Sequence, residues 1–151
     1  KLIQETWLNL YPSGQVPSIP SEQWARLGFQ GTDPSTDFRG MGLHGLRQLH
    51  DFSSHPDAAE VLQHSLEESK WFPFAVVSIN ISAFLLDLLK SCKLDRALVG
   101  PGFPSAPTYN ALFTLIFQKF DSAWMQSDTK DIMDFPRIFK IVKDDFIKEF
   151  V

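Results

Sequence analysis

Residues 74–93 read FAVVSINISAFLLDLLKSCK, the stretch that most strongly constrains the architecture. Its first half, Val76–Ile81, is rich in β-branched residues and would also suit a strand. The apolar pattern continues through Phe84 and Leu88, which is longer than a strand usually runs and favours a helix. The wider segment 71–89 contains proline, serine, asparagine and aspartate, so we expect it to be too short and too polar to span a bilayer. The sequence therefore predicts a buried central helix.

Amphipathic helices are predicted on both sides of this segment, because apolar residues recur there at helical intervals. Upstream, the first predicted helices are Leu2–Leu10 and a short helix that is capped by Ser21 and ended by Gly28. A longer helix is predicted from Thr36 to about Phe52. The next one begins with a capping box at Ser54 and Asp57 and reaches Leu66. Downstream, they are Leu112–Trp124 and a helix from Asp134 to Phe150. Residues 11–20 and 99–107 are rich in proline and glycine and are predicted loops.

The fold class predicted from these segments is all-α, because no two of them form a convincing β-hairpin. The chain has 151 residues and is 44% hydrophobic, which fits one compact domain over residues 1–151 with about six to seven helices. Its 14 phenylalanines and 4 tryptophans predict a core or contact surface built from flat rings.

The charge and cysteine content narrow the possible partners. A net charge of −4 without a basic run argues against nucleic-acid binding and against docking on anionic membrane. The single cysteine, Cys92, allows no internal disulfide and suits a reducing, cytoplasmic setting. Because the chain opens at Lys1, we expect a piece of a longer protein, whose other segments would carry any peripheral attachment to organelle membranes. A monomer without a transmembrane segment is expected.

Residues 40–45, GMGLHG, match the G-x-G-x-x-G pattern of dinucleotide-binding proteins. That pattern requires an apolar strand before it, whereas a polar loop precedes it here, so we interpret these residues as packing glycines. The four histidines lack the spacing of metal ligands, and the chain contains neither a phosphate-binding Walker loop nor a G-x-S-x-G elbow. Neither a metal site nor a stand-alone catalyst is expected.

Arg39 is poorly explained by local stability. If Thr36 caps the helix, Arg39 occupies the third helical position, where glutamate or glutamine completes a capping box. A cation so close to a helix N-terminus also opposes the helix dipole. A salt bridge from Arg39 to Asp33 or Asp37 that holds the polar loop is the interpretation that the residues alone slightly favour. A functional role is the alternative, because polar, glycine-rich loops often carry working side chains.

Aromatic residues on both sides of this loop are predicted to support it. We expect Trp24, Phe29 and Phe38 to pack the segment Gln30–Ser35 against the helix that begins near Thr36.

The same region resembles the signature of the ELMO domain, and the match is closest to the ELMOD (ELMO domain-containing) branch. The matching residues are Trp24, Gly28-Phe29-Gln30-Gly31, Asp33-Pro34, Thr36-Asp37-Phe38-Arg39-Gly40, Gly42 and Gly45-Leu46. Weaker similarity continues through residues 74–82 and 131–135, so most of the chain is covered.

The resemblance implies an all-helical domain that activates GTP hydrolysis by Arf and Arf-like small GTPases. It also implies that Arg39 is the catalytic arginine finger, whereas Gln30, Asp33, Thr36, Asp37, Trp24 and Phe29 support the loop or bind the partner. GTP and Mg²⁺ belong to the GTPase, so no cofactor of this chain is expected. The alternative is a non-catalytic module that binds a small GTPase or a DOCK-type exchange factor, as in ELMO scaffold proteins, where this arginine is typically absent.

Overall fold

The computed structural model describes residues 1–99 and 106–151, which are helical and contain no strand. Their α-helices are α1 (Leu2–Leu10), α2 (Gly42–Ser53), α3 (Ala58–Ser65), α4 (Phe74–Lys90), α5 (Asp95–Leu98), α6 (Ala106–Gln126) and α7 (Phe135–Phe150). Their 3₁₀-helices are η1 (Glu22–Leu27), η2 (Pro34–Phe38), η3 (Glu68–Lys70) and η4 (Ile132–Asp134). The predicted all-α fold class is confirmed.

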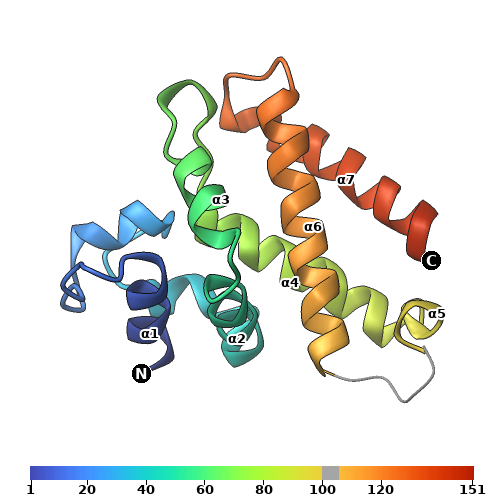
Figure 1. The fold of residues 1–151 in the computed structure, drawn as a ribbon, viewed down its shortest axis with the longest axis horizontal. Coiled ribbons are helices and arrows are strands. Elements are labelled where there is room, and N and C mark those ends of the chain that lie inside the picture. Colours follow the sequence, from blue (N-terminus) through green and yellow to red (C-terminus); the bar gives the residue numbers. More distant parts are fainter. Residues whose placement is uncertain (100–105) are drawn as a thin grey trace.

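Helix α4 lies at the centre of the domain, where α6 crosses it and α2 packs beside it (Figure 1). Its residues Val77, Ile81 and Leu85 are fully buried. They are four positions apart, so they form one face of the helix. The predicted buried central helix is confirmed, although α4 ends at Lys90, three residues before the predicted end.

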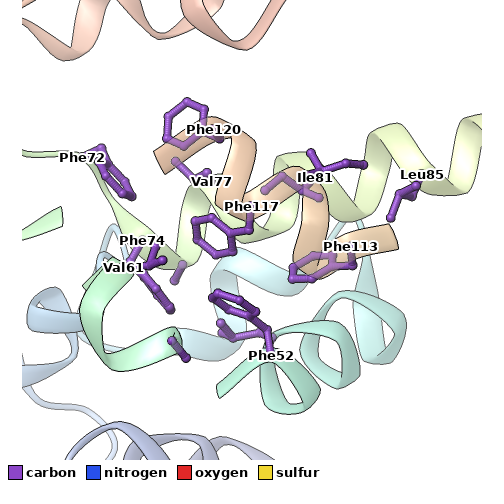
Figure 2. Close-up of a cluster of buried hydrophobic side chains, with 14 of the residues drawn as sticks. Phe52, Val61, Phe72, Phe74, Val77, Ile81, Leu85, Phe113, Phe117 and Phe120 are labelled. Carbon is purple, nitrogen blue, oxygen red and sulfur yellow. The ribbon is translucent and has the colours of Figure 1, made fainter. Parts of the chain in front are cut away.

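The core between these helices is built from stacked and edge-to-face phenylalanine rings (Figure 2). Phe117 of α6 stacks on Phe52 of α2 with a centroid separation of 4.6 Å, and lies 5.0 Å from Phe74 at the start of α4. Phe113 meets Phe52 edge to face at 5.9 Å. Such ring pairs stabilise a core beyond the area that they bury. These ring contacts hold α2, α4 and α6 against one another at the centre of the domain.

The stretch Glu68–Lys90, 23 residues long, is long and apolar enough to cross a membrane by length and composition alone. The expectation that this region is too short and too polar was therefore wrong on those grounds. Half of its most apolar window is buried against the rest of the domain, and α4 contacts both α2 and α6. Core helices of globular domains pass the same test of composition, and this stretch has the packing of a core helix.

Two other predicted boundaries differ from the structure. Helix α3 begins at Ala58, because Ser54 ends α2 instead of opening the next helix, and Asp57 makes no side-chain capping bond. In the predicted loop 99–107, residues 100–105 lie outside the described part of the chain, and Ala106 already belongs to α6.

Candidate functional site

The segment that precedes α2 forms a separate short helix instead of the first turns of one long helix. Asp33 caps η2, and its Oδ1 accepts hydrogen bonds from the Ser35 backbone N–H at 2.9 Å and from the Ser35 hydroxyl at 2.7 Å. Thr36, the predicted cap, lies inside η2 and donates its hydroxyl to the Asp33 carbonyl at 2.9 Å. Helix α2 begins only at Gly42, whose φ of +58° interrupts the helical path. The predicted helix start at Thr36 is therefore wrong.

The two acidic residues of this segment bond to the loop itself. Asp37 Oδ2 accepts a hydrogen bond from the Gln30 backbone N–H at 2.9 Å, which closes the loop between η1 and η2. Asp37 Oδ1 lies 3.3 Å from the Thr36 hydroxyl. Hydrogen bonds from Ser35 hold the pKa of Asp33 below its usual range, and the positive charge of Arg39 adds a smaller contribution.

Arg39 is exposed and follows the last residue of η2. Within the described residues, its guanidinium makes no ion pair within 4.0 Å and no hydrogen bond. The salt bridge to Asp33 or Asp37 that the residues alone favoured is not formed in this part of the chain. Arg39 follows the C-terminal end of η2 and precedes α2 by three residues, so it does not occupy the predicted third position of a helix.

The glycines after Arg39 leave its surroundings open. A Cβ atom added at Gly40 or Gly42 would meet no atom within 4 Å. At Gly45, by contrast, it would lie 2.9 Å from the Met41 Cβ and 3.4 Å from the Phe38 ring. The interpretation of all three as packing glycines is thus right for Gly45 and wrong for the other two. Gly42 instead supplies the left-handed conformation that starts α2.

A row of five aromatic rings, the aromatic row, runs from α1 to the residue before Arg39. The rings are Tyr11, Trp7, Trp24, Phe29 and Phe38, and successive centroids lie 4.7, 5.3, 6.1 and 5.8 Å apart. Trp24 is fully buried, and its indole N–H donates to the Ser18 carbonyl at 2.9 Å. The turn that carries Arg39 therefore rests on a buried aromatic scaffold. The sequence pointed to Trp24, Phe29 and Phe38 but not to the contribution of Trp7 and Tyr11, because that contact joins distant segments.

Gly28 connects the site to the central helix, a role that the sequence did not reveal. It ends η1 in the left-handed conformation, with φ +81°. A Cβ atom at this position would lie 2.3 Å from the Phe74 nitrogen and 2.5 Å from the Pro73 carbonyl carbon. Glycine is needed here both for the backbone angle and for this close approach to the start of α4.

Replacing Gly28 with alanine is expected to lower the free energy of unfolding by at least about 1 to 2 kcal/mol, because the left-handed backbone disfavours a Cβ. The overlap with Pro73 and Phe74 adds to this cost. Urea denaturation followed by circular dichroism measures the effect. Gly31→Ala is the matched control, since a Cβ there meets no atom within 4 Å. Equal stability of the two variants would contradict the assignment.

A second polar cluster lies between α3 and α6, away from Arg39 in the sequence. His64 Nδ1 and Asp121 Oδ2 are 2.8 Å apart. The bond to Asp121 raises the pKa of His64, while burial raises the pKa of Asp121. In the described residues, no group of three or more histidine, cysteine, aspartate or glutamate side chains could hold a metal ion.

The raised pKa of His64 predicts a pH-dependent contribution to stability. A histidine whose pKa is raised on folding stabilises the protein fully below its unfolded pKa, and this contribution is lost as the pH rises through the folded pKa. The stability difference between the natural chain and His64→Gln should therefore shrink as the pH rises above about 6.5, the usual pKa of histidine. His44→Gln is the control of opposite sign, because burial, assisted by Lys90, lowers the pKa of His44. Parallel pH curves for all three proteins would refute this prediction.

Comparisons with known proteins show the family of the chain. The model of the ELMO/CED-12 family matches residues 1–139, so this chain belongs to the ELMO/CED-12 family. It is 34% identical to ELMO domain-containing protein 2 of Mus musculus over 139 residues, which cover 89% of this chain and 47% of that protein. It is 36% identical to ELMO domain-containing protein B of Dictyostelium discoideum over 140 residues, or 91% of this chain and 49% of that protein. The resemblance found in the sequence is confirmed.

A third relative, ELMO domain-containing protein 1 of Bos taurus, is 32% identical over an alignment that covers 99% of this chain and 52% of that protein. The chain thus spans about half the length of the curated relatives that it matches. No solved structure matches it significantly.

Proposed function

We propose that this chain is a GTPase-activating domain for an Arf or Arf-like small GTPase, and that Arg39 enters the partner's nucleotide site. The observation that carries the proposal is an exposed guanidinium with no partner among the described residues, placed on a turn that the rest of the domain supports. A surface arginine held for structural reasons normally pairs with a nearby carboxylate. Here the two nearest in sequence bond to the loop instead.

The chemistry of GTP hydrolysis gives such a group its role. Negative charge develops on the oxygens around the bond between the β- and γ-phosphates, and a guanidinium inserted from another protein stabilises it. Arginine suits this task because its planar donors and permanent charge match phosphate oxygens. GTP and Mg²⁺ are contributed by the GTPase, so Arg39 is the only catalytic group that the proposal requires from this chain.

Two neighbouring features support the approach of a partner. Gly40 and Gly42 present no side chain, so the backbone of another protein can come close to Arg39. No side chain caps the N-terminus of α2, whose positive end favours negative charge such as that of a phosphate. Leu43, which is 53% exposed, offers an apolar contact beside this end of the helix.

The remaining site residues have supporting roles in this proposal. Asp33 shapes η2, and Asp37 fixes the loop through the Gln30 N–H. Thr36 bonds to the Asp33 carbonyl, while Trp24 and Phe29 lie in the aromatic row beneath. These contacts set the position of Arg39 but do not contact the reacting phosphate.

The proposal is tested by single-turnover GTP hydrolysis with a panel of GTP-loaded Arf and Arf-like proteins, with and without this chain. A clear increase in rate for at least one of them is expected. Binding to a GTPase without any increase would reject the catalytic role and leave a binding module. The same panel under the same conditions supplies the intrinsic rates as the control.

A further inference from the structure

A pocket of about 490 Å³ lies at the far end of the aromatic row from Arg39. It is formed by the end of α1, the turn that follows it and η1, and its lining includes Trp7, Tyr11, Gln23 and Arg26. No part of the proposed GTPase-activating site lines it. The pocket shares Trp7 and Tyr11 with the aromatic row, but none of the residues that surround Arg39 contributes to it.

Two hydrogen-bond donors at this pocket are buried without an acceptor among the described residues. Trp7 is 2% exposed, and neither its indole N–H nor the Tyr11 O–H donates to another group in that part of the chain. The other buried indoles differ, because Trp24 donates to the Ser18 carbonyl and Trp124 to the Lys70 carbonyl, both at 2.9 Å. Buried polar groups in folded proteins are normally satisfied, so this pair of donors points to an acceptor supplied from outside the chain.

The charge of the pocket specifies the kind of acceptor. Arg26 is its one charged lining residue, and its guanidinium makes no ion pair among the described residues. The guanidinium lies over the Tyr11 ring, 4.9 Å from the centroid. Burial raises the pKa of Tyr11, while the charge of Arg26 and a hydrogen bond from its guanidinium to the Tyr11 hydroxyl oxygen act in the opposite direction. The Tyr11 hydroxyl keeps its own proton and can still donate it. A single positive charge among N–H and O–H donors favours a singly charged anion.

We propose that this pocket binds a carboxylate on a short aliphatic stem, either a free small acid or the acidic side chain of a peptide. Arg26 neutralises the charge, and the Trp7 N–H and the Tyr11 O–H donate to the carboxylate oxygens. The apolar walls from Trp7 and Leu10 enclose the stem. The indole nitrogen is buried and lies 3.5 Å from the position that a Gly14 Cβ would occupy. The proposal therefore requires the turn at Gly14 to move when the acceptor binds.

The four indole N–H signals in a ¹H–¹⁵N spectrum of the 151-residue chain provide the test. The probes are butyrate, the capped peptide acetyl-Gly-Glu-Gly-amide, its glutamine counterpart and inorganic phosphate. A saturable shift of the Trp7 signal, assigned with Trp7→Phe, is expected with the two carboxylates. The Trp24 and Trp124 signals are internal controls, because their N–H groups already have partners.

Two variants then separate specific binding from a general salt effect. Arg26→Gln should weaken carboxylate binding by about tenfold or more, since it removes a charged hydrogen-bond donor. Arg96→Gln, which changes an exposed arginine of α5, should not alter it.

Tighter binding of the glutamate peptide than of butyrate identifies a peptide as the source of the carboxylate, and the reverse identifies a free acid.

Three results would overturn the proposal. They are equal binding of the glutamine peptide, a saturable shift with phosphate but not with carboxylate, and an unchanged affinity in Arg26→Gln. None of them depends on GTP hydrolysis, so this proposal and the one for Arg39 succeed or fail separately.

Discussion

Arg39→Ala is expected to reduce stimulated GTP hydrolysis by about 10³-fold or more, the scale on which arginine fingers act in other GTPase-activating proteins. The fold should survive this change. Arg39 is exposed and without a partner in the described structure, so the loss of stability should stay within about 0.5 kcal/mol. Single-turnover rates and melting temperatures measured on the same protein preparations test both halves of the prediction.

Arg39→Lys shows whether stimulated hydrolysis depends only on the positive charge of the side chain or also on the planar geometry of the guanidinium. Lysine keeps the positive charge but loses the planar set of donors, so it should restore little of the lost activity. Arg96→Ala is the matched control, because it removes an exposed arginine from α5. Binding of the GTP-loaded partner should remain largely intact in all of these variants, since the finger contributes mainly in the transition state.

Two outcomes would contradict the finger. Full stimulation by a well-folded Arg39→Ala protein would leave a binding module without catalytic action. A fall in activity that follows a fall in melting temperature would instead assign Arg39 a structural role. Either result is visible in the same pair of measurements.

The long helices were predictable because each buries one stripe of side chains. Regular apolar spacing located α1, α4, α6 and α7. This spacing can be read from a single sequence, because a helix that packs along one face needs apolar residues at helical intervals over its whole length. The capping signals at Ser21 and Gly28 also predicted η1 correctly, since both act through local backbone geometry.

Boundaries that depend on long-range contacts were missed. The capping box expected at Ser54 and Asp57 does not form: Ser54 ends α2, and the Asp57 carboxylate accepts a hydrogen bond from Gln118 of α6 at 2.6 Å. Before Arg39, both Asp33 and Thr36 are residue types that commonly cap a helix N-terminus, so the sequence does not decide between them. The left-handed conformation of Gly42 separates η2 from α2, and composition alone does not reveal it.

The sequence motif located the candidate site, but it did not reveal which groups the side chains of the site bond to. The residues alone slightly favoured a salt bridge at Arg39, because two aspartates lie within six positions of it. The structure uses both carboxylates to bond the loop. Such a choice depends on how Gln30 and Ser35 are oriented, which no spacing rule specifies.

Trp24→Ala is expected to lower the free energy of unfolding by about 3 to 5 kcal/mol, the usual cost of removing a buried tryptophan ring. The ring is fully buried, and it meets both Trp7 and Phe29 edge to face. The change also removes the indole donor from the Ser18 carbonyl. Urea denaturation followed by far-ultraviolet circular dichroism measures the loss without relying on tryptophan fluorescence.

Trp71→Ala is the matched control, because that tryptophan is 43% exposed and its removal should cost much less. The Trp24 variant should also lose stimulated hydrolysis at temperatures where it remains folded. The reason is that Phe29 and Phe38, which lie beneath the Arg39 turn, lose their support from the aromatic row. A Trp24→Ala protein with unchanged melting but lost GTPase binding would instead place Trp24 on the contact surface and refute its role as a buried support.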